Sequence, residues 1–243
     1  VVDLNAALLF VLAMLSLGIY GILISGWASS NRFALIGSLR GAAQLISYEV
    51  ALGLSLVGLI MVFPSLRLSR IVEFQGAMLF GFLPKWGIFL QPLGFAVFFL
   101  AGLAETKRVP FDMPEGESEI IGFYTEYGGL KFGLFMFTDF LEVILLSALA
   151  TTLFFGGWQV PWLGAGGFVF PWGGNLKVAP WAVTVLQVLA FNLKVFFFCW
   201  LQVLVRWTYP RFRYDQLMDF GWKVLVPLGV VNILATGLIL AAR

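Results

Sequence analysis

The run NAALLFVLAMLSLGIYGILISG, residues 5–26, carries no charged side chain over 22 residues. A helix of about 20 apolar residues is long enough to cross the hydrocarbon core of a bilayer. Five more apolar segments follow along the chain, at about 45–63, 88–104, 128–155, 183–205 and 224–242. The sequence therefore predicts an all-α integral membrane protein, in which residues 1–243 form a single membrane domain with about six transmembrane helices.

The composition supports this class and excludes others. Hydrophobic residues make up 60% of the chain, charged residues 12%, and the mean hydropathy is +0.95, whereas soluble domains carry roughly 25% charge. With no histidine and one cysteine, the chain alone cannot form a His-ligated haem, a four-cysteine iron–sulfur cluster or a His-based zinc site. We expect no metal on this chain, and any electrons to be carried by partner subunits. The net charge of +2 gives no reason to expect nucleic acid.

The stretch AETKRVPFDMPEGESEIIGFYTEYGGLKFGLFMFTDF, residues 104–140, concentrates acidic groups beside the membrane. Pro114 is well placed to begin a helix whose first turn favours acidic residues. Clustered carboxylates cannot all ionise at neutral pH, which favours proton handling. The alternative is an ordinary solvated acidic helix. Six of the 13 acidic residues fall in the loop 105–127, namely Glu105, Asp112, Glu115, Glu117, Glu119 and Glu126.

Charged residues also occur inside the apolar segments. Asp139 and Glu142 share one face of segment 128–155, and Lys194 lies at a similar counted depth in segment 183–205. Glu49 lies just inside segment 45–63. Because ionisable groups in a bilayer are costly, they are functional candidates by default. We predict that Asp139, Glu142 and Lys194 form a buried ionic or proton-relay site, with a static structural pair as the alternative.

The loops divide by charge and composition. Residues 65–87 suggest a short amphipathic helix or an ordinary loop, and 156–180 is a surface loop rich in Gly, Pro and Trp. Lys and Arg are more frequent in the first, third and fifth loops, which predicts that the acidic loop faces the cytoplasm, or the matrix in a mitochondrion. The arginines there could contact lipid headgroups or an acidic partner surface.

Three motifs in order resemble one family. The acidic stretch is similar to AETNRxPFDLPEAESELV, RGAAQLISYEV (40–50) to a second family signature, and RWTYPRFRYDQLMDFGWK (206–223) to a third. GWASSNRFALIGSLR (26–40) matches as well. Together they resemble the quinone-site membrane subunit, of the bacterial H type, of respiratory complex I, the proton-pumping NADH:quinone oxidoreductase.

The resemblance implies a chain that forms part of a ubiquinone or menaquinone chamber and couples quinone reduction to proton translocation, without a complete active site of its own. It implies FMN and iron–sulfur clusters on partner subunits, and as partners the 49-kDa-type and iron–sulfur hydrophilic subunits and the small and antiporter-like membrane subunits. The expected membrane is the bacterial cytoplasmic (inner) or mitochondrial inner membrane. The carboxylates implied in the coupling path are Glu49, Glu105, Asp112, Glu115, Glu117, Glu119, Glu126 and Asp139. The residues expected to face the chamber or a partner are Arg32, Arg40, Arg108, Phe111, Arg211, Arg213 and Asp215.

The chain departs from the family pattern at a few positions. Lys107 stands where the family usually has Asn, and Asp139 where it usually has Glu. Family members have about eight spans, so we expect N-terminal spans to lie outside this sequence. The sequence leaves three alternatives open. They are the equivalent subunit of a membrane-bound hydrogenase, a stand-alone proton-coupled transporter, and a passive anchor for a hydrogenase-like arm.

Overall fold

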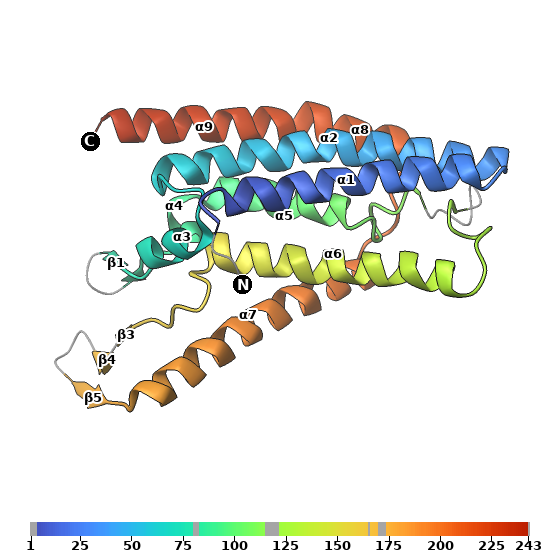
Figure 1. Cartoon of the computed structure of the whole chain (residues 1–243). Helices are drawn as coiled ribbons and strands as arrows, with labels where there is room; N and C mark the ends of the chain where they lie inside the picture. The colour runs from blue at the N-terminus through green and yellow to red at the C-terminus, as the bar shows by residue number, and fades with distance from the viewer. Residues whose placement is uncertain (1–3, 80–82, 115–121, 165, 170–173, 243) are drawn as a thin grey trace.

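A computed structural model of the chain describes residues 4–79, 83–114, 122–164, 166–169 and 174–242, and most of them are helical (Figure 1). Five helical stretches in this part of the chain are long and apolar enough to cross a membrane, and a sixth apolar helix is shorter. This confirms the predicted class of all-α membrane protein. The elements in chain order are α1 (Ala7–Ala28), α2 (Arg32–Val62), α3 (Leu68–Gln75), β1 (Met78–Leu79), β2 (Leu83–Pro84), α4 (Gly87–Leu90), α5 (Pro92–Glu105), α6 (Leu130–Phe154), β3 (Leu163–Gly164), β4 (Gly167–Val169), β5 (Asn175–Lys177), α7 (Pro180–Thr208), α8 (Tyr214–Phe220), the π-helical turn η1 (Gly221–Leu225) and α9 (Val226–Ala241).

Helix α2 begins at Arg32, well before the predicted segment 45–63. The side chain of Asn31 accepts a hydrogen bond from the Phe33 backbone N–H at 2.9 Å and caps the helix, which satisfies a donor that the first turn leaves open. The two arginines in 27–44 predict a loop there, and that prediction is wrong for most of the segment. Arg32 and Arg40 instead lie in the part of α2 that precedes its predicted apolar segment. The helix ends at Val62, just before Pro64.

The predicted segment 88–104 is broken into α4 and α5. Gln91 has φ −135° and ψ 56° and separates the two helices, because the ring of Pro92 disfavours a helical conformation at the preceding residue. Pro92 then occupies the first position of α5, where its missing N–H costs no helical hydrogen bond. With 14 residues, α5 is shorter than the roughly 20 residues that cross a bilayer.

The loop predicted over 206–223 is much shorter in the structure. Helix α7 continues to Thr208, and α8, η1 and α9 form one continuous helical stretch from Tyr214 to Ala241. The π-helical turn ends at Leu225, two residues before Pro227, whose ring cannot fit the regular hydrogen-bond ladder of the preceding turn. The basic, aromatic motif is therefore mainly helical, and only residues 209–213 connect its two helices.

Small antiparallel sheets and a short helix occupy the other predicted loops. Helix α3 and the β1–β2 pair lie within 65–87, in agreement with the helical alternative there. Strands β3, β4 and β5 lie within 156–180, where the sequence predicts a surface loop. Figure 1 shows both sheets at the same end of the molecule, away from the turn that joins α1 to α2.

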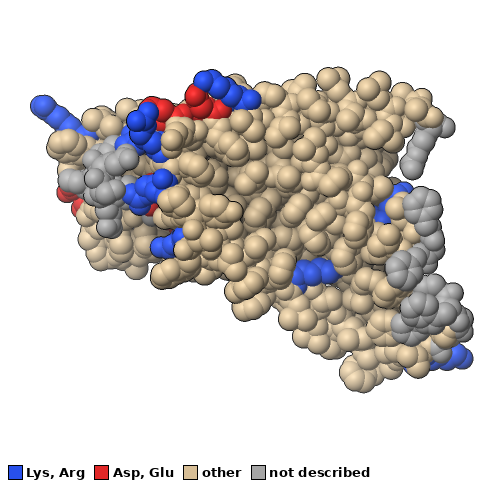
Figure 2. All heavy atoms as spheres, turned by 180° about the vertical axis from the view of Figure 1, so that it is seen from behind, with Lys and Arg blue, Asp and Glu red and all other residues tan. Residues whose placement is uncertain are grey.

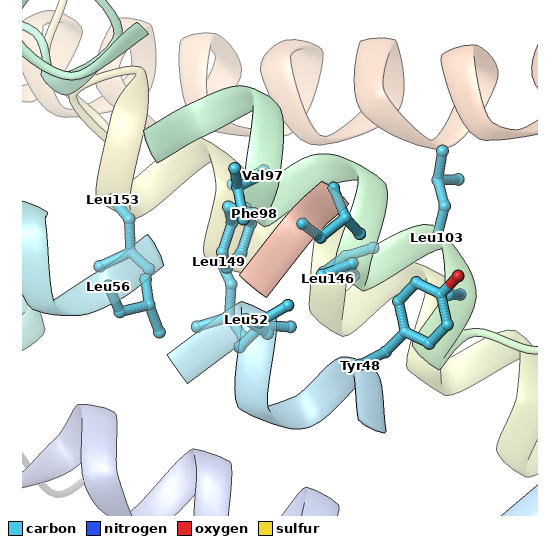
Figure 3. Close-up of a cluster of buried hydrophobic side chains, with 14 of the residues drawn as sticks. Tyr48, Leu52, Leu56, Val97, Phe98, Leu103, Leu146, Leu149 and Leu153 are labelled. Carbon is cyan, nitrogen blue, oxygen red and sulfur yellow. The ribbon is translucent and has the colours of Figure 1, made fainter. Parts of the chain in front are cut away.

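Helix α2 is the centre of the bundle and packs against α1, α5 and α9. In the close-up of Figure 3, Leu52 and Leu56 of α2 meet Phe98 of α5 and Leu149 and Leu153 of α6. All five side chains are buried. Because α2 lies in the middle, polar residues on it face other helices.

The outer helices present apolar side chains to the surroundings. Phe10 and Leu17 of α1 and Leu193 and Phe196 of α7 are each more than half exposed. On the face drawn in Figure 2, charged side chains gather mainly towards one end of the molecule. A broad apolar surface with charges at its margin is the distribution that a bilayer requires.

Candidate functional site

Lys107 forms the centre of a buried ionic cluster. Its Nζ donates a hydrogen bond to Asp139 Oδ1 at 2.9 Å and a longer one to Glu142 Oε1 at 3.4 Å, and it lies 3.2 Å from Glu142 Oε2. The side chains of Lys107, Asp139 and Glu142 are 5%, 6% and 18% exposed. Asp139 and Glu142 share a face of α6 because they are three residues apart. One ammonium therefore bridges two carboxylates inside the bundle.

The turn after α5 directs Lys107 into this position. Thr106 closes the helix by donating its hydroxyl to Leu103 O at 2.9 Å. Lys107 has φ +53°, a left-handed conformation that non-glycine residues adopt infrequently. Burial by itself lowers the pKa of Lys107, but the carboxylates of Glu142 and Asp139 outweigh it and raise the pKa above its ordinary value. Lys107 is therefore charged at neutral pH.

Glu105 lies beside this cluster at the end of α5. Its side chain is buried, and its Oε2 has no hydrogen-bond partner among the residues that the structure describes. Glu105 and Glu142 both line a cavity of about 10 Å³, with Leu146 of α6 among the apolar residues around them. That space is about the size of one water molecule. The two carboxyl groups thus share a small enclosed space.

Glu49 extends the set of carboxylates towards α1. It accepts a hydrogen bond from the hydroxyl of Ser16. Charge on Glu49 is close enough to interact with Glu105. Helices α1, α2, α5 and α6 therefore contribute polar groups to one region of the bundle, and the coupling path that the resemblance implies for Glu49, Glu105 and Asp139 stays a prediction.

Gln44 anchors the segment after Lys107, and sequence analysis did not identify it. Its Nε2 donates to Ala104 O at 2.8 Å and to Phe111 O at 2.7 Å. The ring of Phe111 packs against Tyr48 and stacks on Phe212 at 5.6 Å between centroids. A glutamine on a helix face that packs in the core is a detectable signal, because a buried amide needs partners. The helix that carries this signal was predicted to begin only at residue 45.

A second polar site lies next to the cluster. Arg211 donates to Asp112 Oδ2 at 2.6 Å, and both line a cavity of about 470 Å³. Arg108 and Arg206 line the same cavity, together with apolar side chains such as Phe132. Arg108 Cζ also lies 4.6 Å from the centre of the Phe140 ring. Three guanidinium groups and one carboxylate thus surround a space large enough for a small ring.

Lys194 does not join the ionic cluster, so that prediction was wrong. Its Nζ donates to the carbonyls of Phe155, Gly157 and Gln159 at 2.8, 3.0 and 2.8 Å. It also lies 4.6 Å from the ring of Trp86. Counting residues from the start of each segment placed Lys194 at the depth of Asp139. In the structure Lys194 instead lies against the carbonyls that follow the C-terminus of α6.

The other predicted residues make contacts outside the ionic cluster. Glu126 accepts from Asn31 Nδ2 at 2.6 Å, and Arg40 Cζ is 5.2 Å from the centre of the Tyr214 ring. Arg213 pairs with Asp215 at 2.8 Å with both side chains exposed, and Arg32 begins α2. Glu115, Glu117 and Glu119 lie outside the described residues, so their predicted part in the acidic loop stays a prediction.

No group of three or more His, Cys, Asp or Glu in the described part of the chain is arranged to hold a metal ion. The chemistry available here is hydrogen bonding by guanidinium groups and proton exchange by carboxyl groups.

Comparison with known proteins shows which family the chain resembles. A family model described as NADH dehydrogenase matches residues 1–237.

Curated relatives agree over the whole chain. The first H subunit of the NADH-quinone oxidoreductase of Geobacter metallireducens is 48% identical over 244 aligned residues, which cover 100% of this chain and 65% of the relative. The second H subunit of Geobacter sulfurreducens is 47% identical, covering 99% and 64%, and the first H subunit of Cytophaga hutchinsonii is 41% identical, covering 98% and 65%. The chain spans just under two thirds of the length of these relatives. The predicted resemblance is confirmed, and the chain belongs to the NADH dehydrogenase family, in which these NADH-quinone oxidoreductase proteins are its relatives.

Proposed function

We propose that this chain forms a wall of the quinone chamber in a proton-translocating NADH:quinone oxidoreductase and links quinone reduction to proton movement. The observation that carries the proposal is the contact between two unusual sites. The arginine-lined cavity and the carboxylate cluster adjoin each other through consecutive residues, Lys107 and Arg108. Substrate chemistry and proton handling can therefore communicate over a short distance.

The cavity has the chemistry that a quinone headgroup needs. A quinone ring is flat and apolar, with carbonyl oxygens that accept hydrogen bonds. Arg108 and Arg206 can donate to such oxygens, while Phe132 supplies apolar contact. Asp112 holds Arg211 through their ion pair. Reduction to the quinol takes two electrons and two protons, and the electrons come from FMN and iron–sulfur clusters on partner subunits.

The carboxylate cluster has the chemistry that proton transfer needs. Carboxyl groups that share a small buried space exchange protons more readily than they all ionise together. The groups in question are Glu49, Glu105, Asp139 and Glu142, in a region formed by four helices. On this proposal the hydrophilic subunits dock on the cytoplasmic or matrix side of the membrane. The small and antiporter-like membrane subunits receive the coupling.

Mild-detergent purification of the natural complex, with mass spectrometry of the co-purifying chains, tests the assignment. We expect flavin and iron–sulfur subunits together with antiporter-like subunits. A nickel–iron hydrogenase module would assign the chain to a hydrogenase instead, and isolation without partners would favour a stand-alone transporter.

The chamber itself is tested by Arg206→Gln in the assembled complex. Loss of one guanidinium should raise the KM for quinone about tenfold, as expected when a hydrogen bond to a charged group is removed. NADH oxidation with an artificial soluble acceptor should not change. The matched control is Arg70→Gln on α3, an exposed arginine paired with Glu73. Equal quinone kinetics in Arg206→Gln and wild type would refute the chamber assignment.

A further inference from the structure

Two carboxylates on one helix face repel each other, and Lys107 is the group that offsets this repulsion. Asp139 and Glu142 carry two negative charges within reach of one ammonium, so the three groups have a net charge of −1. Their side chains are almost fully enclosed. In such surroundings a charged group needs a close partner, because desolvation is costly. Without Lys107, one of the two carboxylates would have to take up a proton.

Glu105 differs from Asp139 and Glu142 in its contacts. Lys107 reaches Asp139 and Glu142, but within the described part of the chain no hydrogen bond satisfies Glu105 Oε2. Glu142 Oε2 lies 3.2 Å from Lys107 Nζ without hydrogen-bond geometry, and Glu142 lines the same small cavity as Glu105. The other charged groups nearby are Glu49 on α2 and Arg108 after α5. A carboxyl oxygen that faces a water-sized space is the arrangement that proton exchange requires.

We propose that Lys107 is a positioning residue that holds Asp139 and Glu142 ionised, so that Glu105 is the carboxyl of this cluster that takes up and releases a proton. The role of Glu105 rests on the proposed function, whereas the charge state of the pair does not. Lys107 stands where the family pattern usually has asparagine, which carries no charge.

The experiment uses infrared spectroscopy of the purified complex, in which a protonated carboxyl group absorbs separately from a carboxylate. Lys107→Met should add a protonated-carboxyl band at neutral pH, and Lys107→Arg should not, because it keeps the charge. The band should vanish when Asp139→Asn and Glu142→Gln are added to Lys107→Met, which assigns it to this pair. In the wild-type background, Glu105→Gln should remove an existing protonated-carboxyl band. Lys177→Met, at a lysine of β5, is the matched control and should leave the spectrum unchanged.

Turnover supplies a second readout. Lys107→Met should shift the pH profile of quinone-linked NADH oxidation by about one unit, which corresponds to a tenfold change in proton affinity. Lys107→Arg should keep the wild-type profile, whereas a purely structural role would change activity without moving the profile.

The inference is overturned if Lys107→Met adds no band, or if Glu105→Gln removes none. The proposed function fails separately. If the bands behave as expected but Glu105→Gln keeps full quinone-linked turnover, the charge assignment stands and the coupling role does not. If Lys107→Met prevents assembly, the Lys107→Arg and Glu105→Gln spectra still decide.

Discussion

Two lysines that are enclosed by the bundle, one buried and one half-buried, have different surroundings. Lys107 contacts two carboxylates, whereas Lys194 contacts three backbone carbonyls and the ring of Trp86. Carbonyls at a helix C-terminus attract a cation without titrating, so Lys194 closes the end of α6. Carboxylates titrate, so on our proposal Lys107 controls the charge of Asp139 and Glu142. The comparison shows that two enclosed lysines of one chain differ in whether the groups around them can titrate.

The largest expected effect is at Glu115 and Glu119 of the predicted acidic loop. Glu115→Gln together with Glu119→Gln should lower quinone-linked turnover by more than about 100-fold, because general acid–base groups contribute about 10²–10⁴-fold. NADH oxidation with an artificial soluble acceptor should stay intact, which shows that the complex is assembled. Glu73→Gln on α3, at an exposed glutamate paired with Arg70, is the control and should have no effect. Full quinone activity in the double variant would show that the acidic loop is not part of coupling.

The helices, the acids and the partners of the two lysines were not equally predictable from the sequence. Apolar runs identified the helices, and the concentration of acidic residues beside and inside those runs identified the acids. The extension of α2 to Arg32 was missed because charged residues were assigned to a loop, although Asn31 provides a cap. Sequence distance also cannot show which carbonyls a lysine reaches. Lys194 was therefore given the wrong partner, and the actual partner of Asp139, Lys107, was noted only as a departure from the family pattern.

A smaller effect, on stability alone, is expected when Lys194 is replaced. Lys194→Met leaves the carbonyls of Phe155, Gly157 and Gln159 without their donor, and each unsatisfied buried group costs about 1–3 kcal/mol. Because water or neighbouring groups replace part of this, we expect the free energy of unfolding to fall by about 3 kcal/mol. Thermal unfolding in detergent measures the loss. Quinone-linked turnover of the assembled variant should stay normal, and a shifted pH profile would contradict a structural role.

The smallest expected effect is on the pH dependence of stability, and it tests the charge assigned to Lys107. Its pKa is raised above the ordinary value of 10.5 by Glu142 and Asp139, against the opposing effect of burial. The folded state therefore holds this proton more tightly than the unfolded chain does. The resulting stability is complete below pH 10.5 and is lost as the pH rises through the raised pKa.

Thermal unfolding of wild type, Lys107→Met and the control Lys177→Met, measured at increasing alkaline pH, tests this sign. We expect the stability difference between wild type and Lys107→Met not to shrink below pH 10.5. Above that pH the difference should shrink by up to about 1.4 kcal/mol per pH unit, because each unit corresponds to that free energy for one proton. Lys177→Met should follow wild type throughout, since its ammonium is exposed. A difference that does not change with pH would mean that Lys107 stabilises α5 and α6 through packing, as Lys194 does for α6, and that no charge is held between the two carboxylates.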